Sequence, residues 1–176
     1  MSGSVYRRED CRFCKSPDLE LVLQFTPTPV GSDYLSADQL DDVQESHPID
    51  LFRCKECGYV GLTTVVDARV IWDDSTEITS MSGGLVDHLK EYADTVVHSL
   101  NIPDGSLFVD IGCNDGTLLE GFKKHGLKVL GIDPAINLAK LAEDSKIDRM
   151  VAFFNSETGA EIVDRWGKAS AITATN

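Results

Sequence analysis

The chain has 176 residues, 42% of them hydrophobic, and a formal net charge of −13. This length fits one or two globular domains, and the acidic balance argues against nucleic acid as a general partner, because phosphate binding needs a basic face. No apolar run approaches the roughly 20 residues that span a bilayer, and the start, MSGSVYRRED, lacks the apolar core of a secretory signal. We therefore expect a cytoplasmic protein that does not act at membranes. In that reducing compartment, its five cysteines are expected to be free thiols or metal ligands rather than disulfides.

Four of these cysteines form two Cys-x-x-Cys knuckles, Cys11 with Cys14 and Cys54 with Cys57. Tetrahedral zinc takes four soft ligands, and a tight turn of this spacing supplies two sulfurs on one side. We therefore predict one structural Zn²⁺ ion held by all four, in a small β-rich zinc-binding domain over residues 1–68. A disulfide framework or a redox dithiol is the alternative. The expected reducing compartment disfavours the first, and two knuckles exceed what one exchange reaction needs.

The segment between the knuckles shows strand patterns. An apolar run covers residues 19–25, an acidic polar loop covers 36–46, and apolar and polar residues alternate through 49–62. Gly58 directly follows the second knuckle and permits the positive φ of its turn. The fifth cysteine, Cys113, lies away from both knuckles, so we expect it to pack rather than to bind metal or act as a nucleophile.

Residues 69–105 form a linker segment between this domain and the next. From Gly84 to Leu100 the apolar residues recur at the three- and four-residue spacing of a helix. We predict an amphipathic helix here that packs on the following domain.

Residues 107–134, LFVDIGCNDGTLLEGFKKHGLKVLGIDP, carry the most informative pattern. One apolar run ends in Asp110 and opens into a glycine-containing turn. A helix pattern follows, and then a second apolar run that ends in Asp133. Open α/β sheets bind ligands at the carboxyl ends of their strands, where both acids are expected. The alternative is a βαβ unit with a purely structural turn and solvent-facing acids.

The turn departs from the dinucleotide fingerprint, because it reads G-C-N-D-G rather than G-x-G-x-x-G. Gly112 and Gly116 can take positive φ and let a ligand approach the backbone closely, and Asn114 tolerates the same region. Asp115 adds a negative charge at a helix N-terminus. That charge disfavours a pyrophosphate and is compatible with a cationic ligand.

The two strand-ending acids complete this picture. Asp110 suits an ammonium group, and an acid placed like Asp133, about 20 residues past the turn, typically binds two ribose hydroxyls. The pattern resembles the cofactor site of class I S-adenosylmethionine (SAM) methyltransferases, whose cofactor carries both groups.

Further elements follow in the order expected of this fold. We predict a helix at residues 135–144, a strand near 150–154, a helix at 156–166 and a strand at 169–174. Ser156 suits the N-cap of the third of these elements and Gly167 its C-cap. Residues 106–176 are thus expected to form the N-terminal part of a Rossmann-like SAM-binding domain.

The two signals together resemble a narrower family. A four-cysteine zinc module followed by a turn written D-x-G-x-N-D-G is similar to the SAM-dependent sugar C-methyltransferases. The similarity runs through CRFCKSPDLELVLQF, HPIDLFRCKECGYVGL, FVDIGCNDGTLL and VLGIDPA to FFNSETGAEIVDRWGKASAITATN. It implies an α/β fold, a partial class I sheet preceded by the zinc domain. It also implies methylation of a ring carbon of a nucleotide-linked keto-deoxysugar in deoxysugar biosynthesis, with SAM as the cofactor.

The resemblance also implies a covering segment before the amphipathic helix. Ser80, Ser82 and His88 match its pattern and are added to the cofactor-binding candidates. The tyrosines that the family carries a few residues earlier are absent, and Ser75 and Glu77 stand roughly in their places. This departure keeps a different small-molecule acceptor open.

The family sheet has seven strands, and only four are predicted here. We therefore expect a truncated chain, a fragment or shortened reading frame that lacks the catalytic half, so no catalytic residue is assigned. The fourth strand would then be a sheet edge with unpaired backbone groups, and such edges promote self-association. A non-catalytic module that binds zinc and SAM is the remaining alternative.

Overall fold

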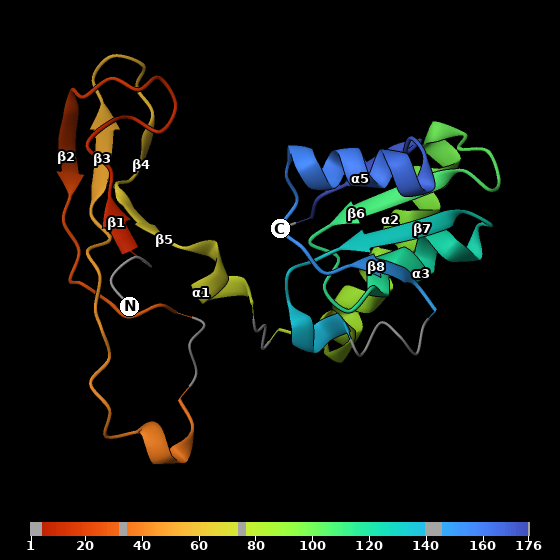
Figure 1. The fold of residues 1–176 in the computed structure, drawn as a ribbon, viewed down its shortest axis with the longest axis horizontal. Helices are drawn as coiled ribbons and strands as arrows, with labels where there is room; N and C mark the ends of the chain where they lie inside the picture. Colours follow the sequence, from red (N-terminus) through yellow and green to blue (C-terminus); the bar gives the residue numbers. More distant parts are fainter. Residues whose placement is uncertain (1–4, 32–34, 74–76, 140–145, 176) are drawn as a thin grey trace. The chain divides into compact units, whose positions relative to one another are not determined.

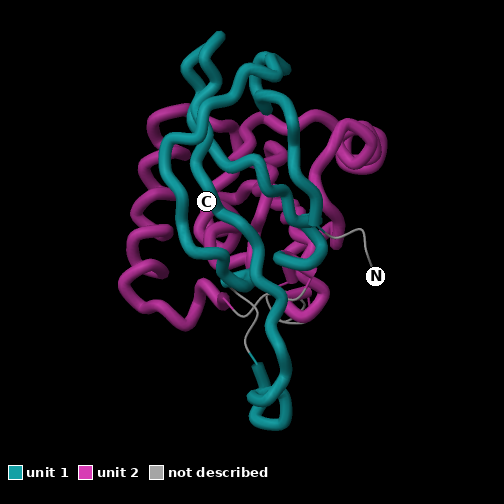
Figure 2. Tube along the Cα trace, turned by 90° about the vertical axis from the view of Figure 1, so that its left-hand side faces the viewer, with its two compact units in different colours: residues 1–71 teal, residues 72–176 magenta. Residues whose placement is uncertain are grey.

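The computed structural model describes residues 5–31, 35–73, 77–139 and 146–175. The chain divides into two compact units, residues 1–71 and 72–176 (Figure 2). No helix in these described stretches is long and apolar enough to cross a membrane.

Unit 1 consists of short antiparallel strands. β2 (Leu19–Leu23), β3 (Leu51–Cys54) and β4 (Val60–Leu62) form a three-stranded sheet in that order (Figure 1). β1 (Val5–Arg7) pairs with β5 (Thr64–Val66) in a separate ribbon. The acidic loop between β2 and β3 contains one short 3₁₀ helix, η1 (Ala37–Gln39). The predicted small β-rich region is therefore confirmed.

Unit 1 has almost no apolar core of its own. Among its described residues only Cys11, Cys54 and Thr63 are buried, while Leu21, Val60 and other strand residues are about half exposed. A domain of this size without a core is usually held together by a metal or by disulfides. The stability of this unit is therefore expected to depend on the cysteines, two of which are its buried residues Cys11 and Cys54.

Unit 2 begins at Trp72, the last residue of the short helix α1 (Ala68–Trp72). The 3₁₀ helix η2 (Thr79–Met81) leads directly into α2 (Gly83–Leu100), which confirms the predicted amphipathic helix. Asn101 ends α2 in the left-handed conformation, with φ 48°, a common way for a helix to stop.

A four-stranded parallel sheet forms the centre of unit 2. Its strands β6 (Leu107–Ile111), β7 (Lys128–Ile132), β8 (Asp148–Met150) and β9 (Ala171–Thr173) are ordered β8-β7-β6-β9. Numbered within this sheet, the strand order is 3-2-1-4, and the expected partial class I α/β sheet is confirmed. β6 and β7 are buried because helices cover both faces, as their continuous apolar runs predict.

The helices divide between the two faces of this sheet. α2 and α3 (Thr117–Lys124) lie on one face and α5 (Ser156–Trp166) on the other (Figure 1). Side chains alternate along β6 accordingly. Phe108 packs with the α2–α3 cluster, and its ring stacks on that of Phe122 at 3.6 Å between centroids. Val109 points to the opposite face, into the cluster that contains Ile162 of α5.

Three predicted boundaries need correction or lie partly outside the described residues. The strand expected at 150–154 is β8, residues 148–150, because Arg149 and Met150 continue the pairing with β7 and the chain then leaves the sheet. The N-cap of α5 is Asn155 rather than Ser156, since the Asn155 side chain accepts hydrogen bonds from Glu157 N and Thr158 N. Gly167 is the C-cap as predicted. Of the helix expected at 135–144, residues 136–139 are helical and 140–144 lie outside the described residues.

Candidate functional site

The four cysteines of the two knuckles converge in unit 1. Their sulfur atoms all lie within 4.8 Å of one another, with Cys11 Sγ 3.7 Å from Cys57 Sγ and Cys14 Sγ 3.5 Å from Cys54 Sγ. A tetrahedron of Zn–S bonds of about 2.3 Å has sulfur–sulfur edges of about 3.8 Å. All four cysteines are free thiols rather than disulfides. The donor set and its spacing therefore fit one zinc ion with a closed sulfur shell.

The two knuckles share one backbone pattern. In each, the first cysteine accepts a hydrogen bond from the residue four positions on, Lys15 N to Cys11 O and Gly58 N to Cys54 O. Each also donates to the residue five positions on: Cys11 N to Ser16 O and Cys54 N to Tyr59 O. Lys15 and Gly58 have φ values of 66° and 76°.

This repeated turn aims two sulfurs at one point from each side. The positive φ of Gly58 was predicted from the sequence, whereas that of Lys15 was not, because a lysine gives no signal of positive φ. The backbone N–H of Cys14 is the main cause that lowers the pKa of Cys11 to about 6. At Cys14 the lowering effect of the Ser16 backbone N–H is outweighed by burial and by contacts with the other three sulfurs, which raise its pKa. Within this knuckle, Cys11 rather than Cys14 is therefore poised to give the thiolate that zinc requires.

The second site lies at the carboxyl ends of β6 and β7 in unit 2. Asp110 is only 1% exposed, and its Oδ1 accepts a hydrogen bond from Thr173 Oγ1 at 2.6 Å. Burial raises the pKa of Asp110 to about 6, against the lowering effect of the Thr173 hydroxyl and with a small addition from the charge of Asp133. A buried carboxylate of this kind gains stability from a cationic group placed beside it.

The glycine turn after Asp110 adopts the predicted conformation. Gly112, Asn114 and Gly116 all have positive φ, at 76°, 51° and 89°. A Cβ at Gly112 would have no heavy atom within 4 Å, so the space beside this backbone is open to a ligand. Gly112 N and Cys113 N both donate to Ile132 O, which fixes the turn to the end of β7.

Asn114 and Asp115 hold protein segments together in this structure. Asn114 Oδ1 accepts from Thr79 N, and its Nδ2 donates to Glu77 O. Asp115 Oδ2 accepts from Ser80 N, and its Oδ1 accepts from both the amide and the hydroxyl of Thr117. Burial opposes ionisation of Asp115, but these hydrogen bonds outweigh it and lower its pKa. The two side chains thus fasten the segment before α2 onto the turn.

The three remaining cofactor-binding candidates differ in whether they are hydrogen-bonded to that turn. They are Ser80, Ser82 and His88. Ser80 bonds to it directly, through its backbone N–H. Ser82 is the N-cap of α2 without a side-chain cap bond. His88 is exposed on α2, and no hydrogen bond in the described part of the chain joins it to the turn. Their assignment to cofactor binding stays a prediction.

Asp133 is held by a partner that sequence reasoning missed. Its Oδ2 accepts from Asn114 N at 2.8 Å and its Oδ1 from Ala135 N at 2.9 Å. The Arg149 guanidinium lies 3.3 Å from Oδ1, and both side chains are largely buried, 6% exposed for Arg149 and 11% for Asp133. Arg149 also donates to the carbonyls of Asn114 and Ala135. No motif marks this arginine, because only the parallel pairing of β7 with β8 brings it to the turn.

Cys113 packs as predicted. It is buried, and its sulfur lies against Gly131, where a Cβ would collide with it. Burial raises its pKa to about 12, which leaves it neither a thiolate nucleophile nor a metal ligand.

Comparisons with known proteins bear on both units. Residues 11–72 match the Methyltransf_13 family model, which is described as a "putative zinc binding domain". The match covers most of unit 1, so this unit is similar to that zinc-binding domain. The chain is also 31% identical over 172 residues to the C-methyltransferase NovU of Streptomyces niveus. This alignment covers 98% of the chain and 41% of NovU. The predicted resemblance to zinc-containing C-methyltransferases is therefore confirmed.

Two further similarities cover smaller parts. A ubiquinone biosynthesis O-methyltransferase of Rhodopseudomonas palustris (strain BisA53) is 39% identical over 67 residues, 38% of the chain and 26% of that protein. The crystal structure of magnesium protoporphyrin IX methyltransferase from Synechocystis PCC 6803 with bound SAM matches with a TM-score of 0.38 and 20% identity. That match covers 60% of the chain and 52% of the structure. The chain thus spans less than half the length of either curated relative. The zinc-binding family model and the sequence similarity to two methyltransferases support the predicted cofactors, zinc and SAM.

Proposed function

We propose that this chain forms the zinc and cofactor-binding part of a SAM-dependent C-methyltransferase that acts on a nucleotide-linked keto-deoxysugar. The observation that carries the proposal is the juxtaposition, at the carboxyl ends of β6 and β7, of a buried Asp110, an open left-handed turn at Gly112 and a second acid, Asp133. The 31% identity to C-methyltransferase NovU over nearly the whole chain supports C-methylation.

The residues of the turn suit the chemical groups of SAM. Asp110 would receive the ammonium of the methionine part, because it is a buried carboxylate short of a cation. Gly112 would let that part lie against the backbone, where the structure leaves open space. Asp133 would bind the ribose mainly through Oδ2, which accepts only from Asn114 N among the described residues, because Oδ1 already faces Ala135 N and the Arg149 guanidinium.

SAM, when bound, supplies a methyl group on a sulfonium leaving group. The protein's part is to hold the cofactor and acceptor in line and to limit water at the site. The segment 77–82 is placed for the second role, since Asn114 and Asp115 tie it to the turn. Carbon methylation beside a keto group also needs a base that removes the acidic proton, and we assign that base to no described residue.

Zinc takes a structural role in this proposal. A shell of four cysteines leaves no open position for water or substrate. The ion instead replaces the apolar core that unit 1 lacks, and so keeps its strands together.

A different acceptor on the same architecture is the second candidate. The position of Glu77 favours it, because the family carries tyrosines in this region and here the Glu77 backbone is fixed to Asn114 instead. Ser75, the other departure, lies outside the described residues. A non-catalytic module that binds zinc and SAM is a third possibility. Association through the edge strand β9 stays a prediction.

Binding of SAM to the purified chain tests the cofactor site. Isothermal titration should give a dissociation constant in the micromolar range for the natural chain, weakened at least about tenfold in Asp110→Ala, since a charged hydrogen bond is lost. Asp104→Ala changes an acid outside the turn and is the matched control. A natural chain that does not bind SAM, or equal affinities in all three proteins, would rule out the site.

The acceptor needs the intact enzyme. Methyl transfer from isotope-labelled SAM to a nucleotide-linked keto-deoxysugar, followed by NMR of the product, should place the new methyl group on a ring carbon. A methylated oxygen or nitrogen, or no transfer to any sugar nucleotide, would favour the second candidate.

A further inference from the structure

A hollow lies at the opposite end of the sheet strands from the cofactor turn, and the proposed function assigns no role to the residues that line it. It lies at the amino ends of the strands, where Leu107, Lys128 and Asp148 begin β6, β7 and β8. Its volume is about 360 Å³, within the range of roughly 300–1,000 Å³ typical of small-molecule sites.

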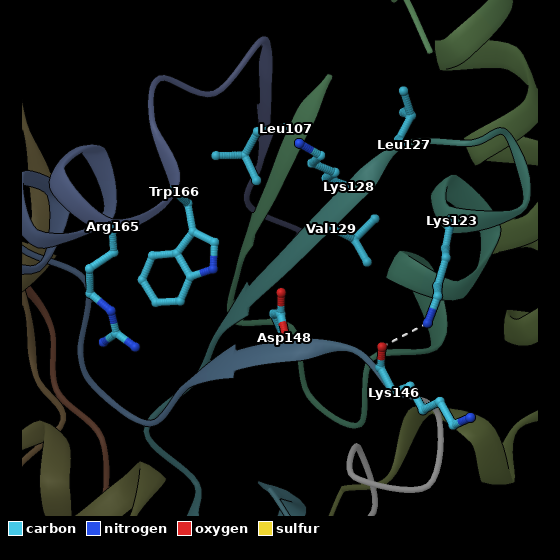
Figure 3. Close-up of a pocket in the computed structure, with 9 residues that line it drawn as sticks. All are labelled: Leu107, Lys123, Leu127, Lys128, Val129, Lys146, Asp148, Arg165 and Trp166. Atoms are coloured by element: carbon cyan, nitrogen blue, oxygen red, sulfur yellow. Dashed lines mark hydrogen bonds between the residues drawn. The ribbon is translucent and has the colours of Figure 1, made fainter. Parts of the chain in front are cut away.

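The floor of this hollow is apolar and partly aromatic. Leu107, Leu127 and Val129 are buried, and the indole of Trp166 is half-buried beside them. The Arg165 guanidinium lies over that indole, 4.1 Å from its centroid. Figure 3 shows Trp166 and Arg165 on one side of the hollow and Lys123 and Lys146 on the other. The floor can therefore receive a flat apolar group.

The rim of the hollow is basic. Among the described residues that line it, four are cationic, and Asp148 is the one carboxylate. The cations are Lys123, Lys128, Lys146 and Arg165. The chain has only 16 lysines and arginines against 29 acids, so this gathering is the reverse of its general balance.

Two of these cations have no bonding partner among the residues that the structure describes. Arg165 pairs with Glu161 at 2.7 Å, and Lys123 Nζ donates to Lys146 O at 2.7 Å. Within the described stretches no hydrogen bond or ion pair involves the ammonium of Lys128 or Lys146. Because both are exposed at the rim, they can turn toward an anion above the apolar floor without breaking an existing contact.

We infer that this hollow is a binding site for a small aromatic phosphate, of the class of a nucleoside monophosphate, separate from the cofactor turn. A flat ring would rest on Trp166 and the aliphatic floor, and the phosphate would lie between Lys128 and Lys146. The ring explains the aromatic floor and the phosphate explains the unpaired ammonium groups. Neither an uncharged apolar ligand nor a bare inorganic anion uses both features.

Tryptophan fluorescence tests this inference, because the chain has only two tryptophans, Trp72 and Trp166. In a Trp72→Phe background, UMP should quench Trp166 emission with a dissociation constant below about 1 mM, the weak end of specific binding. Uridine and inorganic phosphate, each lacking half of the ligand, should bind at least about tenfold more weakly. Saturating S-adenosylhomocysteine should leave the UMP affinity unchanged, because the two sites lie at opposite strand ends.

Charge reversal at the rim supplies the decisive comparison. Lys128→Glu and Lys146→Glu should each weaken UMP binding at least about fivefold, because a local attraction becomes a repulsion. Lys124→Glu is the matched control, since Lys124 is exposed and adjacent to Lys123 in sequence but does not line the hollow. Melting temperatures of all three verify folding, and isothermal titration confirms the affinities independently of fluorescence.

The possible results separate clearly. The inference would be overturned if Lys128→Glu and Lys124→Glu affected UMP binding equally, or if S-adenosylhomocysteine displaced UMP. It would also be overturned if inorganic phosphate bound as tightly as UMP, or if UMP did not bind up to about 5 mM. Because the cofactor turn has its own variant, Asp110→Ala, loss of SAM binding would leave this inference untouched.

Discussion

The hydroxyl of Thr173 donates a 2.6 Å hydrogen bond to the carboxylate of Asp110, although the two residues are 63 positions apart. Thr173 is the last residue of β9, and Asp110 lies opposite it in the parallel pairing with β6. Both are buried. The fourth strand of the sheet therefore supplies the bond that holds the central acid of the candidate cofactor site.

Replacing Thr173 by valine should weaken this site. The valine keeps the volume but removes the donor, which leaves a buried carboxylate short of one hydrogen bond at a cost of about 1–3 kcal/mol. Because the Thr173 hydroxyl lowers the pKa of Asp110, its loss should raise that pKa further and reduce SAM affinity near pH 6. Urea unfolding and calorimetric titration measure the two effects. Thr173→Ser retains the hydroxyl and should behave nearly as the natural chain.

The pH dependence of stability should reveal the buried charge of Asp110. Burial raises its folded-state pKa to about 6 from the ordinary value of 3.8, so the folded chain binds this proton more tightly than the unfolded chain. The protonated Asp110 therefore contributes stability that is fully present below about pH 4 and is lost as pH rises through about 6. The total loss in the free energy of unfolding is about 3 kcal/mol.

Asp110→Asn should therefore be more stable than the natural chain at pH 8 and equally stable near pH 4, while binding SAM poorly. Urea midpoints of both proteins across this range measure the difference, in which the titration of all other groups cancels. A stability difference that does not change with pH would show that Asp110 is not the titrating group.

Arg149→Met should destabilise unit 2 strongly. It removes the buried cation from Asp133 and two donors from the carbonyls of Asn114 and Ala135. Breaking a buried ion pair from one side typically costs about 3–5 kcal/mol. Arg165→Met removes an exposed arginine that pairs with Glu161 and should cost less than about 1 kcal/mol. Thermal melting of the two variants makes the comparison, and equal losses would contradict the positioning role of Arg149.

Removal of zinc should unfold unit 1 selectively. The unit has almost no buried apolar side chains, so its folding should depend on the metal. A strong chelator should expose residues 1–71 to limited proteolysis while a fragment close to residues 72–176 survives. Metal analysis of Cys54→Ser should show less than one zinc per chain. Cys113→Ser should retain a full equivalent, because Cys113 lies in unit 2.

The sequence by itself determined the features that depend on local spacing. Two Cys-x-x-Cys pairs indicate zinc because each pair fits one turn, and the structure brings all four sulfurs together. The run from Asp110 to Asp133 predicted a βαβ unit because its apolar periods are strong and its turn residues take positive φ. Element ends were less certain. β8 begins two residues and ends four residues earlier than predicted, since pairing with β7 rather than hydrophobicity sets its limits.

Only the tertiary structure decided which distant side chains surround the turn. Asn114 and Asp115, predicted as cofactor ligands from their place in the motif, also bind Thr79 and Ser80, and Arg149 holds Asp133 from another strand. The basic hollow likewise joins α3, α5 and three strand starts. The physical reason is common to all of them. A buried polar group must find a partner, and the order of strands in the sheet, rather than the local sequence, determines which partner is within reach.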